Sequence, residues 1–139
     1  PSAITRLTEM GIETFLIASA VDCVVAQRLA RKLCSHCKRR TLLSPQVFAE
    51  IEFRVGAEIE AYEPVGCARC NQSGYRGRVG LFSVMRMSER IKQMAVAGAP
   101  EQEVAMIARQ EGMLTLREDG VGKVRGGLTS LEEVIRVTT

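Results

Sequence analysis

Hydrophobic residues near the start of the chain recur at helical spacing. They fall on one face of residues 2–10, which predicts a short helix that stops at Gly11. Residues 12–21 are apolar on nearly all sides, so this stretch predicts a second helix that belongs inside a larger domain. The β-branched residues that open the next apolar stretch favour a strand over 24–32.

The middle of the chain has shorter patterns. Ser44 followed by Pro45 is typical of a capped helix start, and a short helix is expected to run to residue 51. Residues 54–66 have little apolar periodicity and are expected to be irregular. A turn is expected over 74–78, and residues 79–85 are apolar on both faces, which predicts a central strand.

Helical patterns dominate after Ser88, which can cap the first of them. The spacing of Thr129 and Glu132 is that of a capping box, in which two side chains satisfy the first backbone N–H groups of the last helix. The expected helices cover, in order, residues 89–97, 99–112, 114–125 and 129–135.

Composition narrows the class of protein. A chain of 139 residues can form one ordinary domain or two small modules, and 46% hydrophobic residues are enough for a buried core. Aromatic residues make up only 4%, fewer than expected for a protein that stacks single-stranded bases. The net charge of +3 is small, and no apolar run is long enough to span a membrane.

Two Cys-x-x-Cys pairs are the strongest chemical pattern in the chain. Cys34 and Cys37 form the first pair, Cys67 and Cys70 form the second, and 29 residues separate the pairs. Each spacing lets one turn present two thiolates, and two such turns complete the tetrahedral coordination of a structural zinc ion. Two disulfides or four unrelated thiols are the alternatives. The pairing of the cysteines and the absence of a secretory signal argue against both.

Other residues near these pairs have simpler interpretations. His36 is expected to be an exposed turn residue rather than a metal ligand, and Cys23 a buried small hydrophobe. Six basic residues lie within 28–40, and they could bind nucleic acid, acidic lipid or an acidic partner if they shared a face. Glu132 and Glu133 are expected to be helix-surface and cap residues, because no paired-carboxylate geometry is evident.

Several segments together resemble a known family. They are Met10–Ser19, Val25–Cys37, Cys67–Arg78, Met113–Gly120 and Leu128–Thr138. These segments look like the C-terminal third of the secretion ATPases, the motors of type II secretion and type IV pilus assembly. The resemblance covers essentially the whole chain and is more specific than the cysteine spacing alone.

The resemblance implies an α/β fold with four parts. Residues 1–33 would be the C-terminal end of a RecA-like ATPase domain, and 34–74 an inserted tetracysteine zinc module. Residues 75–87 would return to the ATPase domain as a strand that pairs with the strand at 24–32. Residues 88–139 would form a helical C-terminal segment.

The resemblance also implies a function in protein transport. The parent protein would be a hexameric cytoplasmic ATPase at the cytoplasmic face of the bacterial inner membrane. Its partners would be the other subunits of the homo-hexamer and the cytoplasmic part of an inner-membrane platform protein, and no nucleic acid is expected.

ATP and magnesium would bind only the parent. The phosphate-binding loop, the acidic metal-binding segments and the histidine motif of the family are not in this sequence, and by resemblance they lie upstream of Pro1. The chain alone is therefore not expected to hydrolyse ATP. The resemblance suggests that Arg78 faces a nucleotide site in the manner of an arginine finger, because a guanidinium suits developing phosphate charge. A structural salt bridge or a solvated turn is the alternative for Arg78.

The alternative function is that of a binding adaptor rather than a motor. The chain could be a free-standing zinc-ribbon adaptor that binds nucleic acid or protein, and the arginine-rich first cysteine pair favours this weakly. The apolar strand at 79–85 and the apolar helix at 12–21 favour the motor, because both need an absent domain to cover them.

Overall fold

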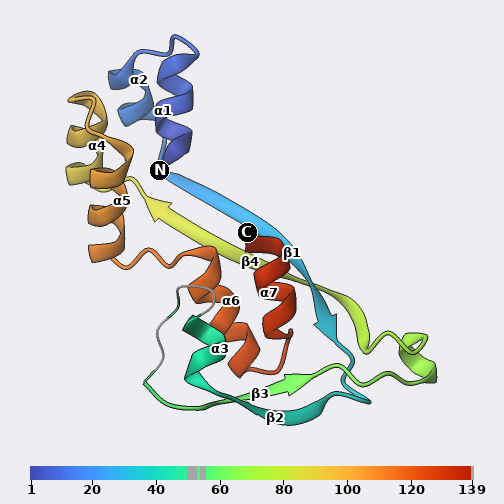
Figure 1. The fold of residues 1–139 in the computed structure, drawn as a ribbon. Coiled ribbons are helices and arrows are strands. Elements are labelled where there is room, and N and C mark those ends of the chain that lie inside the picture. The colour runs from blue at the N-terminus through green and yellow to red at the C-terminus, as the bar shows by residue number, and fades with distance from the viewer. Residues whose placement is uncertain (50–52, 54–55, 139) are drawn as a thin grey trace. The chain divides into compact units, whose positions relative to one another are not determined.

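A computed structural model describes residues 1–49, 53 and 56–138. These residues contain both helices and strands, which confirms the mixed class expected from the sequence (Figure 1). Within this part of the chain, no helix combines the length and the apolar character needed to cross a lipid bilayer.

The chain divides into two compact units. The first unit contains Pro1–Ala26 and Phe82–Thr115, and the second contains Gln27–Leu81 and Leu116–Thr139. Residues 88–115 of the expected helical segment fall in the first unit, and residues 116–139 fall in the second.

The first unit is helical. It contains α1 (Ser2–Glu9), α2 (Thr14–Ala20), α4 (Glu89–Val96) and α5 (Glu101–Gln110), and these bounds lie close to the predicted ones. Helix α2 packs against α1 and α4, and α4 packs against α5. The buried side chains at the centre of this unit include Ile4, Ile17, Met85, Ile91, Val104 and Ile107.

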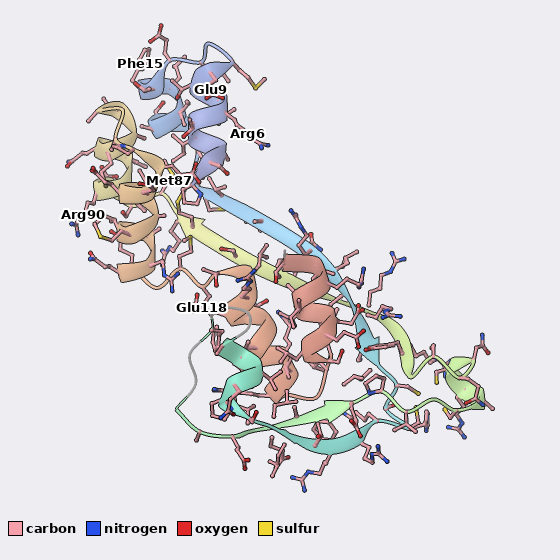
Figure 2. The ribbon with its side chains drawn as sticks, in the orientation of Figure 1. Arg6, Glu9, Phe15, Met87, Arg90 and Glu118 are labelled. Carbon is pink, nitrogen blue, oxygen red and sulfur yellow. The ribbon has the colours of Figure 1, made fainter. Side chains whose placement is uncertain are left out.

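Part of the first unit's apolar surface is exposed. Phe15 of α2 is 57% exposed and Leu16 is 48% exposed. Phe15 and Arg90 both project away from the helices that carry them (Figure 2). Only Ile17 and Ala18 of α2 are buried, so the described residues cover one side of this helix.

A two-stranded sheet pairs β1 (Cys23–Leu33) with β4 (Tyr75–Arg86). This pairing confirms the expectation, and the two strands run in opposite directions (Figure 1). Strand β4 begins at Tyr75, so most of the predicted turn at 74–78 is strand. The prediction of a central strand is wrong for the described residues, because the sheet has two strands and Phe82 and Val84 are exposed.

The second unit contains an antiparallel pair that the sequence patterns did not reveal. Strand β2 (Arg39–Leu43) pairs with β3 (Ile59–Glu63) in a register that places Thr41 opposite Ala61. The expectation that 54–66 is irregular is therefore wrong for the residues of β3. Only Ile59 and Ala61 of β3 are buried, and this alternation is too short to stand out in the sequence.

Three helices complete the second unit: α3 (Pro45–Ala49), α6 (Leu116–Arg125) and α7 (Leu131–Thr138). The predicted end of the helix at 45–51 lies outside the described residues. Helix α6 packs against α7 and β3 (Figure 1). Leu114 precedes α6 and is 54% exposed, so its expected place in that helix is wrong. The buried core includes Ala30, Phe48, Leu81, Val121, Val124 and Val134.

Candidate metal centre

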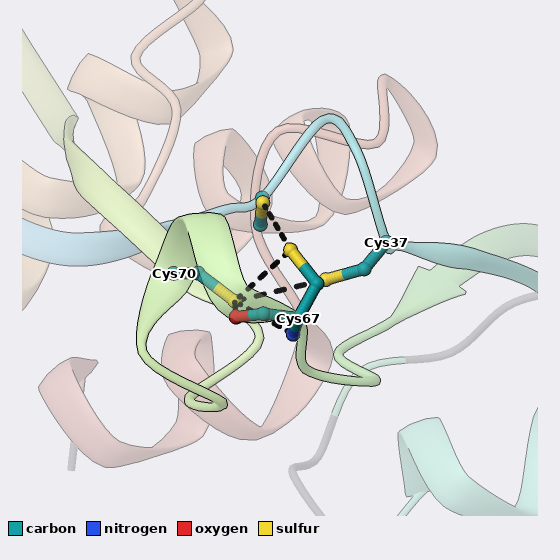
Figure 3. Close-up of side chains that lie close together, drawn as sticks. Cys37, Cys67 and Cys70 are labelled. Atoms are coloured by element: carbon teal, nitrogen blue, oxygen red, sulfur yellow. Dashed lines mark hydrogen bonds between the residues drawn. The ribbon is translucent and has the colours of Figure 1, made fainter.

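The four paired cysteines come together in the second unit. All four Sγ atoms lie within 4.8 Å of one another, and none is in a disulfide. The Cys34 and Cys67 sulfurs are 3.9 Å apart, those of Cys37 and Cys70 are 3.8 Å apart, and those of Cys67 and Cys70 are 3.7 Å apart (Figure 3). The clustering of the four predicted ligands is therefore observed.

The sulfur separations suit a tetrahedral metal ion. A tetrahedron with metal–sulfur bonds of about 2.3 Å, the usual zinc–thiolate length, has edges of about 3.8 Å. A disulfide would instead need sulfurs about 2.05 Å apart. The donor set and its spacing therefore fit a closed four-thiolate site.

Backbone hydrogen bonds shape both cysteine turns. In the first turn, the N–H groups of Cys37 and Lys38 donate to the Cys34 carbonyl at 3.4 and 3.0 Å. In the second, a short 3-10 helix, η1 (Ala68–Cys70), lets Cys70 N–H donate to the Cys67 carbonyl at 3.1 Å. Each pair is thus held in a compact turn that points both sulfurs the same way.

Gly74 joins the two turns and cannot be replaced without strain. Its carbonyl accepts a hydrogen bond of 2.9 Å from Cys34 N–H, and its own N–H donates to Cys70 Sγ at 3.3 Å. Its φ of +75° favours glycine, and an added Cβ would lie 2.4 Å from Pro64 Cβ. The backbone there has to approach closely to bring the turns together.

Backbone N–H groups also differentiate the thiols. Desolvation raises the pKa of Cys70, but N–H donors from Cys67 and Gly74 outweigh it and lower that pKa to about 6. Desolvation, only partly offset by the Gly66 N–H, raises the pKa of Cys37 to about 11. A thiolate at Cys70 is therefore available near neutral pH, and a bound cation would stabilise the thiolate form of Cys37.

Two predictions about neighbouring residues have opposite outcomes. His36 is exposed and contacts the Arg69 guanidinium at 2.9 Å, as expected for a turn residue outside the sulfur cluster. Cys23 is exposed at the start of β1, so the prediction that it is buried is wrong.

The basic run at 28–40 does not form one phosphate-binding face. Arg39 pairs with Glu63 and Arg40 with Glu60, both across the β2–β3 pair. Other members point into the second unit: Arg31 binds the Glu133 carboxylate, and Lys38 donates to a backbone carbonyl. Most of these charges therefore have partners within the molecule.

Glu133 is the important residue that sequence reasoning placed wrongly. Its side chain is fully buried rather than on the helix surface. It accepts hydrogen bonds from the Arg31 backbone N–H at 2.8 Å and side chain at 2.7 Å, and two more from Arg136. The three-residue spacing of Glu133 and Arg136 was the available signal. The other partner, Arg31 on β1, is distant in sequence, so no local pattern indicated it.

Arg78, the other predicted site residue, is separate from the cysteine cluster. It is an exposed residue of β4. A nucleotide role for it stays a prediction.

Comparison with known proteins places the chain in a family. A family profile described as "Type II/IV secretion system protein" matches residues 1–136. The chain is 42% identical over 139 residues to the type IV pilus assembly ATPase PilB of Thermus thermophilus, covering 98% of this chain and 16% of that protein.

Two relatives from secretion systems agree with this match. The chain is 40% identical to the type II secretion system protein HxcR of Pseudomonas aeruginosa, covering 99% of the chain and 26% of the relative. It is 38% identical to the type II secretion system protein E of Aeromonas hydrophila, covering 98% of the chain and 27% of the relative. The chain thus spans about a quarter or less of the length of these relatives. It belongs to the type II/IV secretion system protein family.

Proposed function

We propose that Cys34, Cys37, Cys67 and Cys70 hold one structural zinc ion. The observation that carries this proposal is the cluster of four sulfurs within 4.8 Å, with separations that match a zinc–thiolate tetrahedron. The ion would close the excursion between β1 and β4, whose strand pair β2–β3 is small. The chain's own residues would fix the sulfurs through the two turns and the N–H donors around Cys70.

We further propose that the chain is the metal-bearing part of an ATPase that powers type II secretion or type IV pilus assembly. The family match and the names of the relatives, which are pilus assembly ATPases and secretion system proteins, support this. In the proposed parent, residues 1–33 and 75–87 continue a RecA-like domain and 34–74 is its zinc insertion. The parent would bind ATP and magnesium and work as a hexamer.

The proposed setting is the cytoplasmic face of the bacterial inner membrane, where the parent would contact a platform protein. The sequence has no phosphate-binding loop of the form G-x-x-x-x-G-K-[ST], so this chain alone should not hydrolyse ATP. Arg78 would contribute to a nucleotide site only in the intact, assembled parent.

Metal analysis tests the zinc proposal. Protein purified without added metal should contain about one equivalent of zinc, because closed four-ligand sites bind the ion tightly. Cys67→Ser should lose the zinc and melt residues 34–74 locally, whereas Cys23→Ser should change neither, since Cys23 is outside the cluster. Elemental analysis and hydrogen exchange measure the two effects.

An unchanged zinc content in Cys67→Ser would show that the ligand assignment is wrong. Zinc loss from Cys23→Ser would point to a different ligand set.

A further inference from the structure

The first cysteine turn is held from outside by the C-terminal part of the chain. We use "C-terminal turn" for residues 127–130, which connect α6 to α7. Residues 31–38 contain two of the four cysteines and also bind this turn. The two cysteines therefore lie in a segment whose position the C-terminal turn helps to determine.

Three hydrogen bonds join the two segments. Leu33 N–H donates to the Leu128 carbonyl at 2.9 Å, directly before the first cysteine. The hydroxyl of Thr129, which is fully buried, donates to the Arg31 carbonyl at 2.8 Å. Lys38 Nζ, directly after the second cysteine of the pair, donates to the Gly127 carbonyl at 2.7 Å. Hydrogen bonds to the C-terminal turn thus flank the first cysteine turn, before its first cysteine and after its second.

The contact at Lys38 is closely packed. Its Nζ lies 4.4 Å from the centre of the Tyr62 ring, in cation–π geometry. Gly127 has a φ of +64°, and an added Cβ would lie 2.7 Å from the Tyr62 ring and 2.9 Å from Lys38 Nζ. The C-terminal turn can approach the cysteine turn this closely only with glycine at position 127.

Helix α7 anchors the C-terminal turn to the same strand. Buried Glu133 accepts hydrogen bonds from the backbone and side chain of Arg31, and the Arg31 guanidinium lies 4.1 Å from the centre of the Tyr75 ring. The Tyr75 hydroxyl is 2.8 Å from the Ser130 hydroxyl. Tyr75 directly follows Gly74, so the C-terminal turn and α7 together contact both ends of the cysteine excursion.

We infer that the C-terminal turn is a positioning element of the metal centre, with Lys38, Gly127 and Thr129 as positioning residues that do not touch the metal. This inference rests on the proposed zinc site. Residues outside the ligand set that orient it contribute to metal affinity. Because binding and docking are linked, the coupling is reciprocal: metal binding stabilises the docked C-terminal turn, and docking strengthens metal binding.

Competition for Zn²⁺ against a chromogenic chelator tests the first direction with the full chain. Lys38→Met and Thr129→Val each remove one of these hydrogen bonds while keeping a side chain of similar size. Each should weaken Zn²⁺ binding about tenfold or more. Arg40→Met and Glu132→Gln are matched controls that should leave the affinity unchanged. Arg40 pairs with Glu60 in an exposed contact, and Glu132 is the exposed neighbour of Glu133.

Hydrogen exchange on the unmodified protein tests the reverse direction and needs no variant to fold. Removing Zn²⁺ with a chelator should speed exchange in α7 and at Leu33 as well as in residues 34–74. If Lys38→Met and Thr129→Val both bind Zn²⁺ with the affinity of the wild type, the inference is overturned. Exchange that rises only in 34–74 after zinc removal would overturn it too. A wild-type protein that binds no Zn²⁺ would instead refute the proposed metal site itself.

Discussion

Glu133 shows how a single buried charge can connect distant parts of the chain. Its carboxylate is fully buried, yet four hydrogen bonds from Arg31 and Arg136 satisfy it. Hydrogen bonds from Arg136 first, and then from Arg31, outweigh desolvation and lower the pKa of Glu133 to about 2. Removing one partner of such a buried pair is costly, because the other charge stays buried without compensation.

The lowered pKa predicts a stability effect at acidic pH. The carboxylate is favoured in the folded state, so its contribution is fully present above the ordinary pKa of 4.5 and is lost as pH falls toward 2. Glu133→Gln should lower the free energy of unfolding by about 3 kcal/mol near neutral pH. The difference from wild type should shrink as pH falls through this range. Urea denaturation at several pH values measures it.

The environment of Glu133 makes this prediction specific. Arg31 and Arg136 stay charged in this range, and desolvation raises the already high pKa of Tyr75. Glu132→Gln is the control, because Glu132 is the exposed neighbour on the same helix. A difference between wild type and Glu133→Gln that does not depend on pH would contradict the assigned pKa.

At the scale of elements, serine caps define where two helices start. Ser88 Oγ accepts a hydrogen bond of 3.3 Å from Ile91 N–H and begins α4 as predicted. In α7, Ser130 Oγ accepts from Glu133 N–H, so the cap lies one residue after the predicted Thr129. Thr129 instead uses its hydroxyl to bind β1, a competing role that only the tertiary contact explains.

The cap of α4 can be tested by substitution. Ser88→Ala should lower the free energy of unfolding by about 1 kcal/mol, because one helix N–H loses its acceptor. The Ser88 hydroxyl also donates to Glu111 at 3.0 Å, so Ser88→Thr should keep most of the stability. Ser19→Ala is the control, as Ser19 is exposed in α2 and its hydroxyl donates to a carbonyl of its own helix. Denaturant unfolding would contradict the capping role if both alanine variants behaved alike.

At the scale of the whole molecule, the chain covers only part of the length of its relatives. It spans 16% of the PilB relative from Thermus and about a quarter of the secretion relatives. The proposed parent would offer further surface to exposed apolar residues such as Phe15 and Phe82.

A role for Arg78 can be tested only in that parent. Arg78→Ala in the full-length, assembled protein should lower ATP turnover, since a supplied arginine can be worth on the order of a thousandfold in rate. Zinc content and fold should be unchanged, because Arg78 is exposed and outside the cysteine cluster. Arg78→Lys should rescue poorly, because an ammonium cannot bind two oxygens as a planar guanidinium does.

Steady-state ATPase assays, metal analysis and oligomer size would be compared for these variants. Arg76→Ala, on the same exposed strand, is the matched control. Normal turnover in an assembled Arg78→Ala protein would rule out the catalytic role. A loss that accompanies zinc release or misfolding would assign Arg78 a structural role.

The sequence by itself determined the features of this protein that depend on short motifs and on residues close together in the chain. The cluster of four thiols was predicted from two Cys-x-x-Cys spacings, and most helices follow from apolar periodicity with flanking caps and glycines. The pairing of β1 with β4 was expected from the family resemblance and is observed. These features depend on residues close together in sequence, or on motifs specific enough to identify a family.

Tertiary structure alone decided the features that depend on distant partners. Strand β3 pairs with β2, from which α3 and further residues separate it in the chain, and its short pattern does not reveal it without that partner. The sequence left open whether the six basic residues at 28–40 share a face, and the structure pairs Arg31 with Glu133 and Arg39 with Glu63. The buried carboxylate of Glu133 is stabilised by its helix neighbour Arg136 and also by Arg31, which the fold brings to it from 102 positions earlier in the chain. Burial and pairing of charges are properties of the packed chain, which is why the sequence patterns could not determine them.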